Sequence, residues 1–299
     1  MHHSATGFAK TRVATYSDAR RAQPRPAPVP DFVQPPQPPQ VLYDDQAARF
    51  DERAGLPVHA VESIAASLAE IVGIAEGQRW LEVGAGTGSL SLPLLRRAIR
   101  YRGFDRSPAM LDVFRQRAAA AGVHAELHVA DGNEPWPAGD ASVDVVFAAR
   151  ALHHVHTAHA VAETRRVLAP GGWLAVGRVR RPPDSPRSVL RRRMRQLLRD
   201  EGYAGRSGER HADAVFDALA SAGATPHPPR EAARWTTMHS PADSLASWRE
   251  KAGLAGLELP ADVKERVLHA LAEWALAEIG DLHRPLPQDE SFEIQAIRI

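Results

Sequence analysis

The chain has 299 residues, and its 37 Lys and Arg are nearly balanced by 36 Asp and Glu. A net charge near zero gives no support to nucleic-acid binding, and the length allows one α/β domain with a small accessory part. The lack of cysteine excludes disulfides, thiolate metal sites and a cysteine nucleophile. No apolar run suits a membrane span or a signal peptide, so we expect a cytoplasmic protein.

The first 40 residues are predicted to form a disordered, proline-rich tail. Proline dominates the stretch from Ala22 to Gln40, which cannot bury a core. A PxxP recognition role is an alternative to a solvated tail. Folded structure is expected from about Val41, where Tyr43, Phe50 and residues 56–74 carry apolar side chains at helical spacing.

A short apolar run, Trp80–Val83, is followed by glycines at positions 84, 86 and 88. Glycine permits positive φ and a close approach of the backbone to a ligand. We predict a strand, a tight turn and a helix from Ser89, whose first N–H groups could hold a polar ligand. The third glycine comes one position earlier than in the dinucleotide fingerprint Gly-x-Gly-x-x-Gly.

Acidic residues end the next two predicted strands. Residues 99–104 lead to Asp105, and residues 125–130 lead to Asp131. A carboxylate at such a strand end can accept both hydrogen bonds of a ribose diol. Between these strands, Ser107-Pro108 begins a predicted helix that runs towards Gly122. Either aspartate alone could be a turn or cap residue, but their order after the glycine turn favours a binding site.

The following segments continue an alternating α/β pattern. Val143–Ala149 is an apolar run typical of a buried parallel strand, and Ala151-Leu152-His153-His154-Val155 follows it. A helix from about Ala158 leads to Arg166-Val167-Leu168-Ala169-Pro170-Gly171-Gly172 and then to a strand over residues 173–177.

With Glu82 two residues before the first glycine, these segments resemble class I S-adenosylmethionine (SAM)-dependent methyltransferases. The resemblance is strong over about residues 43–180 and is closest to the small-molecule group that includes ubiquinone- and menaquinone-biosynthesis enzymes. It implies an α/β, Rossmann-like fold with a seven-stranded, mostly parallel sheet. The last strand would be antiparallel, with helices on both faces and a small helical cap. It also implies in-line transfer of a methyl group from SAM to a small-molecule acceptor.

The resemblance further implies which residues hold the cofactor. The glycines would let the backbone approach the methionine and ribose portions, and Asp131 would bind the adenine amino group. The cofactor-binding set is Glu82, Gly84, Ala85, Gly86, Gly88, Asp105, Arg106, Met110, Asp131, Gly132, Asn133 and Ala149. No metal is implied.

His153 and His154 are the candidate catalytic residues, because they follow the fourth strand near the expected methyl group. A histidine can act as a base near neutral pH. The alternative is that one of them caps the strand end, and a base is needed only for a protonated nucleophile. Candidate substrate contacts are Tyr43, Phe50, Arg150, Trp235, His239, Trp248 and Arg249. Tyr43 and Phe50 would belong to a lid over the cofactor, with core packing as an equal alternative.

The predicted methyltransferase domain spans residues 41–299, with the SAM-binding core at 41–180. Residues 181–299 would supply the rest of the sheet and a substrate cap, including a helical insertion at about 240–285. Strands are expected at 234–239 and 292–299, and helices at 185–200, 211–222, 242–252 and 261–279. The first of these helices is rich in arginine. Such a helix can mark an anionic surface or an RNA partner, but it is more often the solvated back of an amphipathic helix.

Several alternatives remain at this point. The chain could be a SAM-binding regulator without catalysis, or an NAD(P)-dependent oxidoreductase. Adenine-amino methyltransferases of DNA or RNA carry Asn/Asp-Pro-Pro-aromatic after the fourth strand, whereas this chain has Ala148-Ala149-Arg150-Ala151. No nucleic-acid partner is therefore expected. The sequence identifies neither the methyl acceptor nor the oligomeric state.

Overall fold

The computed structural model describes residues 1, 56–203, 208–251 and 253–299. The chain divides into two units, residues 1–37 and 38–299, and the helices and strands below belong to the second unit. The predictions for the proline-rich tail, Tyr43 and Phe50 lie outside the described residues.

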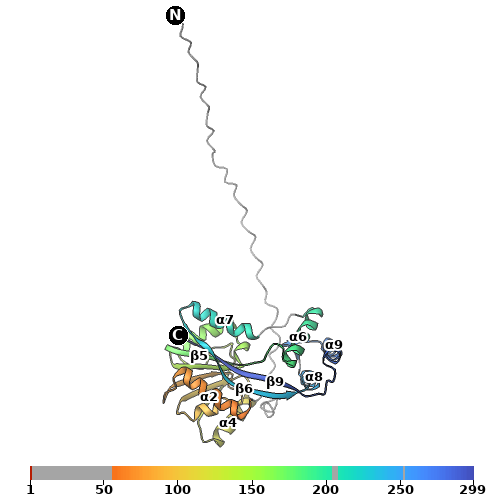
Figure 1. Cartoon of the computed structure of the whole chain (residues 1–299). Helices are drawn as coiled ribbons and strands as arrows, with labels where there is room; N and C mark the ends of the chain where they lie inside the picture. Colours follow the sequence, from red (N-terminus) through yellow and green to blue (C-terminus); the bar gives the residue numbers. More distant parts are fainter. Residues whose placement is uncertain (2–55, 204–207, 252) are drawn as a thin grey trace. The chain divides into compact units, whose positions relative to one another are not determined.

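A seven-stranded sheet in the order β3-β2-β1-β4-β5-β9-β6 forms the centre of this unit (Figure 1). The strands from β1 to β5 pair in parallel, and β9 is antiparallel to both β5 and β6. The predicted α/β fold with an antiparallel last strand is confirmed. The strand bounds are β1 Arg79–Val83, β2 Arg100–Asp105, β3 Glu126–Val129, β4 Val143–Ala149, β5 Leu168–Arg180, β6 Thr225–His239 and β9 Leu286–Arg298.

Helices cover both faces of the sheet, and each face has its own apolar core. On one face lie α2 (Val58–Val72), α3 (Leu92–Leu95) and α4 (Pro108–Ala120). On the other lie α5 (Thr157–Val167) and α7 (Gly208–Ser221), as Figure 1 shows for α7 opposite α2 and α4. Burial of apolar side chains between helix and sheet is the main stabilising contribution in such layers.

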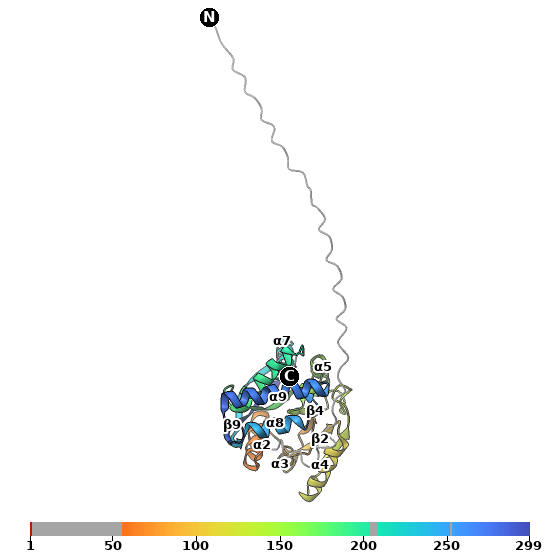
Figure 2. The same ribbon diagram turned by 90° about the vertical axis from the view of Figure 1, so that its right-hand side faces the viewer.

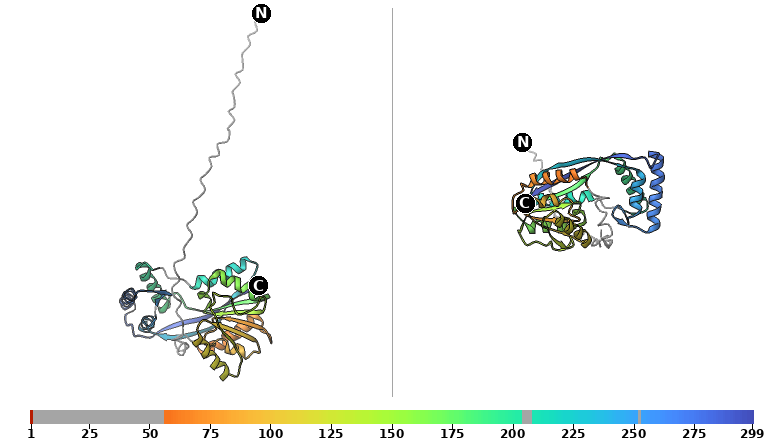
Figure 3. Two further views of the ribbon diagram at one scale, coloured as in Figure 1. Left: turned by 180° about the vertical axis from the view of Figure 1, so that it is seen from behind. Right: turned by 90° about the horizontal axis from the view of Figure 1, so that it is seen from below.

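A third apolar core joins α6 (Pro186–Asp200), α8 (Pro241–Arg249) and α9 (Ala261–Ile279). These helices gather at one end of β6 and β9, and Figure 2 looks onto α8 and α9 (see also Figure 3). A small two-stranded sheet, β7 (Gly253–Leu254) with β8 (Leu257–Glu258), lies between α8 and α9 in sequence. Because β5 leads from its C-terminal end into α6, this helical end lies beyond the carboxyl edge of the parallel strands.

The helix predicted from Ser89 is the clearest error. Residues 89–91 form a turn, and α3 begins only at Leu92. The Gly88 carbonyl accepts hydrogen bonds from the N–H groups of Ser91 and Leu92, both at 3.0 Å. Ser91 does not cap the helix with its side chain, because that hydroxyl donates to Glu82 instead. The N–H groups of Ser91 and Leu92 are therefore not available to a ligand at this helix start.

The last two strands are longer than predicted. β6 begins at Thr225 rather than Arg234, although prolines stand at positions 226, 228 and 229. It lies at the sheet edge, where a residue without an N–H is tolerated, and its register with β9 shifts between His227 and Arg230. The start of β9 pairs with the end of β6, His239 with Leu286. Among the described residues, no helix has the length and apolar character to cross a membrane.

Candidate functional site

The glycine turn after β1 is hydrogen-bonded to β2. The N–H groups of Gly84 and Ala85 both donate to the Phe104 carbonyl at 2.9 Å. All three glycines have positive φ, at 71°, 52° and 75° for Gly84, Gly86 and Gly88. These values lie in the left-handed region that side chains other than glycine rarely adopt.

The three glycines serve different purposes. A Cβ atom on Gly84 would collide with the side chain of Ala151, and one on Gly88 would collide with the ring of Phe114. A Cβ atom on Gly86 would meet no other atom within 4 Å. Gly84 and Gly88 thus allow the turn to pack tightly against the protein, and Gly86 faces open space. Of the three glycines predicted to let the backbone approach a cofactor, Gly86 is the one with open space beside its Cα atom.

Asp105 ends β2 with its carboxylate held in one orientation. Its Oδ2 accepts the Gly86 N–H at 2.9 Å, and its Oδ1 accepts the Ser107 N–H at 3.0 Å. Each carboxylate oxygen can accept a further hydrogen bond. The side chain therefore links the turn after β1 to the start of α4 and keeps acceptor capacity at the strand end. Met110, in the first turn of α4, is buried.

The loop after β3 is tied to the loop after β4. Asp131 accepts the Asn133 N–H at 2.9 Å and pairs with Arg106 at 3.2 Å. The Asn133 side chain then donates to the His154 carbonyl at 3.1 Å and accepts the His156 N–H at 2.8 Å. A Cβ atom on Gly132 would press on Val155 at 2.7 Å. The structure thus brings the predicted residues of two strand ends together.

Glu82 is buried within β1, and its carboxylate accepts hydrogen bonds from the hydroxyls of Ser91 and Tyr101. Burial raises the pKa of Glu82 to about 7, while the two hydroxyls act in the opposite direction. The sequence analysis missed Ser91 and Tyr101. Their contact depends on the β1–β2 register, which aligns Glu82 with Gly103, and the sequence pattern does not specify that register.

The candidate histidines lie directly after β4. Arg150 has a positive φ of 58°, and its N–H donates to the Gly177 carbonyl on β5 at 3.0 Å. A short 3₁₀ helix follows over Leu152–His154, and Leu152 anchors it in the core. His153 and His154 are exposed, with ring centroids 4.0 Å apart.

Comparison with known proteins finds relatives for the part of the chain that carries these strand ends. Residues 81–176 match the family described as Methyltransferase domain. This matched segment is similar to class I SAM-dependent methyltransferases. An uncharacterized methyltransferase of Mycobacterium tuberculosis is 43% identical over 102 residues, which cover 34% of this chain and 40% of that protein. The 27-O-demethylrifamycin SV methyltransferase of Amycolatopsis mediterranei is 33% identical over 143 residues, covering 45% and 48% respectively.

The match thus spans less than half the length of these two relatives. Two solved structures share the fold of this chain at 20% sequence identity. The YcgJ protein of Bacillus subtilis aligns over 80% of this chain and 97% of its own, with a TM-score of 0.50. The [4+2]-cyclase SpnF aligns over 86% and 93%, with a TM-score of 0.51.

SAM, the cofactor of this superfamily, fits the residues present. Gly86 opens towards unfilled space, and Asp105 offers a fixed acceptor at the neighbouring strand end. The next strand end presents Asp131 and Asn133. Among the described residues, no group of three His, Asp or Glu is arranged to hold a metal ion.

In the part of the chain that the structure describes, the predicted substrate contacts do not form one cluster. Trp235 on β6 is buried, and its Nε1 donates to Glu290 at 3.0 Å. His239 lies at the end of β6, 3.6 Å from the Asp243 carboxylate. Trp248 is only 3% exposed inside the core of the helical end, and Arg249 on the same helix pairs with Glu265 at 3.5 Å.

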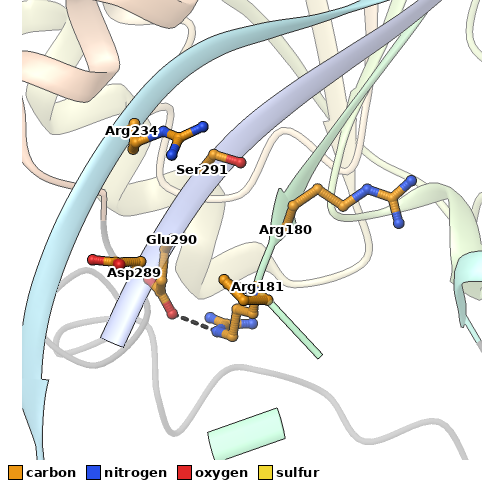
Figure 4. A pocket seen from close by; sticks show the side chains of 7 residues that line it. Arg180, Arg181, Arg234, Asp289, Glu290 and Ser291 are labelled. Carbon is orange, nitrogen blue, oxygen red and sulfur yellow. Dashed lines mark hydrogen bonds and ion pairs between the residues drawn. The ribbon is translucent and has the colours of Figure 1, made fainter. Parts of the chain in front are cut away.

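A pocket of about 250 Å³ opens where β5, β6 and β9 approach the helical end (Figure 4). Trp235 is not among the lining residues, but it donates to Glu290, which lines the pocket and also accepts a hydrogen bond from Arg181. Its polar lining was not anticipated from the sequence, because it combines residues more than 100 positions apart. The lining residues are Arg180, Arg181, Pro182, Arg234, Asp289, Glu290 and Ser291.

Proposed function

We propose that this protein transfers a methyl group from SAM to a small-molecule acceptor by in-line displacement. The observation that carries the proposal is the series of three adjacent strand ends in the order β3-β2-β1. They present Asp131 with Asn133, then Asp105, then the open face of Gly86. Open α/β sheets bind ligands at this carboxyl edge.

The residues at these strand ends would divide the cofactor among them. Asp105 accepts hydrogen bonds from the ribose diol, and Asp131 accepts one from the adenine amino group. The loop after β3, which would hold the adenine, is tied to the loop after β4 through Asn133 and Gly132. This contact supports the assignment of both loops to one site. Arg106, Met110, Ala85 and Ala149 complete the walls.

The role proposed for Glu82 is indirect. Its buried carboxylate accepts hydrogen bonds from Ser91 and Tyr101 beneath the glycine turn. It therefore positions the turn, and with it the backbone of Gly86, rather than serving mainly as a direct ligand. Gly84 and Gly88 support the same geometry through tight packing.

The chain's contribution to the reaction is alignment and exclusion of water. Bound SAM supplies an electrophilic methyl group on a sulfonium. Holding the acceptor's nucleophile in line with that methyl group can lower the barrier by several kcal/mol, roughly 7–11 in favourable cases. His153 or His154 would accept the proton of a hydroxyl-type nucleophile, since both follow β4 at the same edge.

Relatives support a small-molecule acceptor without naming one. They include the rifamycin-type enzyme above and a ubiquinone biosynthesis O-methyltransferase of Alkalilimnicola ehrlichii. A protein-L-isoaspartate O-methyltransferase of Methylorubrum populi also matches part of the chain. A protein acceptor is therefore the second candidate, and the [4+2]-cyclase that shares the fold is a reason to test for turnover as well as binding.

The test combines calorimetry with a transfer assay. S-adenosylhomocysteine (SAH) is expected to bind and NAD is not; NAD binding without SAH binding would overturn the proposal. The protein is then incubated with methyl-labelled SAM and metabolite extract, and labelled products are identified. Label in a small molecule supports the proposal, label only in protein favours the second candidate, and SAH binding without any label indicates a SAM-binding regulator.

A further inference from the structure

The arginines of α6 do not all lie in solvent. Arg187 and Arg191 are four residues apart, so they share one face of the helix, and both are partly buried. Other arginines of α6 have local partners: Arg192 donates to the Pro183 carbonyl at 3.1 Å and Arg199 to Gln196 at 2.5 Å. Arg187 and Arg191 therefore do not belong to a solvent-exposed face of the helix.

The partly buried arginines lack compensating negative charge. Within the described residues, the side chains of Arg187 and Arg191 make no ion pair or hydrogen bond, and the Nε of Arg187 is buried without a partner. Glu290 is the nearby carboxylate, and it already accepts hydrogen bonds from Arg181 and Trp235. An uncompensated buried charge is costly, so an arrangement of this kind indicates a binding site for an anion.

The electrostatic environment agrees with this geometry. Burial and the charges of Arg181, Arg187 and Arg195 together lower the pKa of Arg191 to about 10, against the opposite effect of Glu290. Burial and Arg181 also lower the pKa of Arg187. An anion placed among these guanidinium groups would relieve their mutual repulsion.

The face of α6 that carries Arg187 and Arg191 adjoins the pocket at the carboxyl edge of the sheet. Arg181 and Glu290 line that pocket, and Figure 4 shows their contact. The backbone N–H of Arg187 donates to the buried Gln288 at 3.2 Å, which ties the start of α6 to β9. Gly177 on β5 is the partner of Ala149 at the end of β4. Arg180 lies three residues further along β5, a distance of about 10 Å at the rise of a strand.

We propose that Arg181, Arg187 and Arg191 bind a phosphate or diphosphate group on a small-molecule ligand. The planar guanidinium fork matches the oxygens of a phosphoryl group, and several arginines with one acidic neighbour suit a multivalent anion better than a single carboxylate. Identifying that ligand as the methyl acceptor rests on the function proposed above. The phosphoryl group would then anchor the acceptor at a distance from the atom that is methylated.

The test is calorimetric titration of the full chain with pyrophosphate at constant ionic strength. Wild type is expected to bind, and the double variant Arg187→Gln with Arg191→Gln to bind at least 10-fold more weakly. The matched control replaces Arg192 and Arg199 by Gln on the same helix, with the same change in net charge. It should stay within threefold of wild type. Absence of binding to wild type, or equal weakening in the control, would overturn the proposal.

Two further measurements keep the outcome decisive. Arg191→Lys retains the charge but not the fork, and we expect a smaller loss than in the double variant; unchanged affinity would contradict recognition by the fork. Citrate is titrated as a multivalent carboxylate, and tighter binding of citrate than of pyrophosphate would contradict the phosphoryl assignment. SAH is titrated into every sample. Pyrophosphate binding without SAH binding would defeat the methyltransferase proposal alone.

Discussion

The strand ends of the sheet and the helical end of the molecule are built on different principles. Around Gly86 and Asp105, backbone N–H groups and short polar side chains fix the geometry, with most hydrogen bonds local or between neighbouring strands. In the helical end, apolar side chains of α6, α8 and α9 pack together, and charged side chains with few partners lie at the boundary with the sheet.

This difference indicates how one fold can keep its cofactor while changing its acceptor. The strand-end geometry depends on positions where little else fits, such as Gly84 against Ala151. The helical end depends on the amount of apolar burial, which many side chains can supply. Alterations in the helical end should therefore leave cofactor binding intact, and alterations at the strand ends should leave the helical core intact.

Trp248→Ala should have the largest effect on stability, and it should disturb the helical end without affecting the strand ends. Trp248 is 3% exposed, and removal of a fully packed Trp costs about 3–5 kcal/mol. We expect a loss of stability of this order in urea denaturation followed by circular dichroism. SAH affinity, measured well below the transition, should stay within threefold. A parallel loss of SAH affinity would show that the two regions are not independent.

Glu82→Gln should change how the free energy of unfolding depends on pH, because the buried Glu82 carboxylate lies below the strand ends. Burial raises the pKa of Glu82 from 4.5 to about 7. Between these values the folded chain holds a proton that the unfolded chain has released. The free energy of unfolding should therefore fall as the pH rises from 4.5 to 7, by about 3 kcal/mol in total.

The Gln side chain still accepts hydrogen bonds from Ser91 and Tyr101 but cannot titrate, so the variant should lose this fall. Urea denaturation across the same pH range measures it. Glu62→Gln, which alters an exposed carboxylate, is the control and should keep the wild-type slope. Parallel curves for the Glu82 variant and wild type would contradict the assignment.

His153→Ala and His154→Ala separate the two candidate bases. A general base contributes at least about 100-fold, so we expect one variant to lower kcat by that factor and the other by less than about threefold. Steady-state assays with the acceptor found by methyl labelling measure this, with SAH affinity as the control for folding. Equal small effects of both would assign the histidines to the strand-end loop instead.

Removal of residues 1–40 should have the smallest effect. The predicted domain boundary lies after this segment, so SAH affinity should remain within twofold in calorimetric titrations. A loss of 10-fold or more would assign part of the segment to the cofactor pocket. This segment would then be a third region of the chain, beside the strand ends and the helical end, that determines ligand affinity.

The sequence predicted the strand ends better than the helical end, for physical reasons. Asp105 ends β2 and Asp131 follows β3, as the local sequence pattern of the two strands predicted. The early part of β6 escaped prediction because its prolines are tolerated only at a sheet edge, and edge position is a property of the whole sheet.

The side chains that act across elements were the hardest to predict. Tyr101 reaches Glu82 only in the observed register of β1 and β2. Arg187 and Arg199 look equivalent in the sequence of α6, and only the packing of α6 beside β9 distinguishes them. Trp248 was expected to contact substrate, and the structure places it in the core between helices instead.

The most direct test of this division of labour is a crossed binding experiment. SAH and pyrophosphate are each titrated into wild type, Asp105→Ala and the Arg187/Arg191 double Gln variant, with Asp112→Ala as the exposed-carboxylate control. Loss of two hydrogen bonds to a carboxylate should weaken SAH binding about 100-fold in Asp105→Ala, with pyrophosphate binding unchanged. The double variant should show the reverse. SAH binding to Asp105→Ala at wild-type affinity, or loss of both ligands in either variant, would contradict the account.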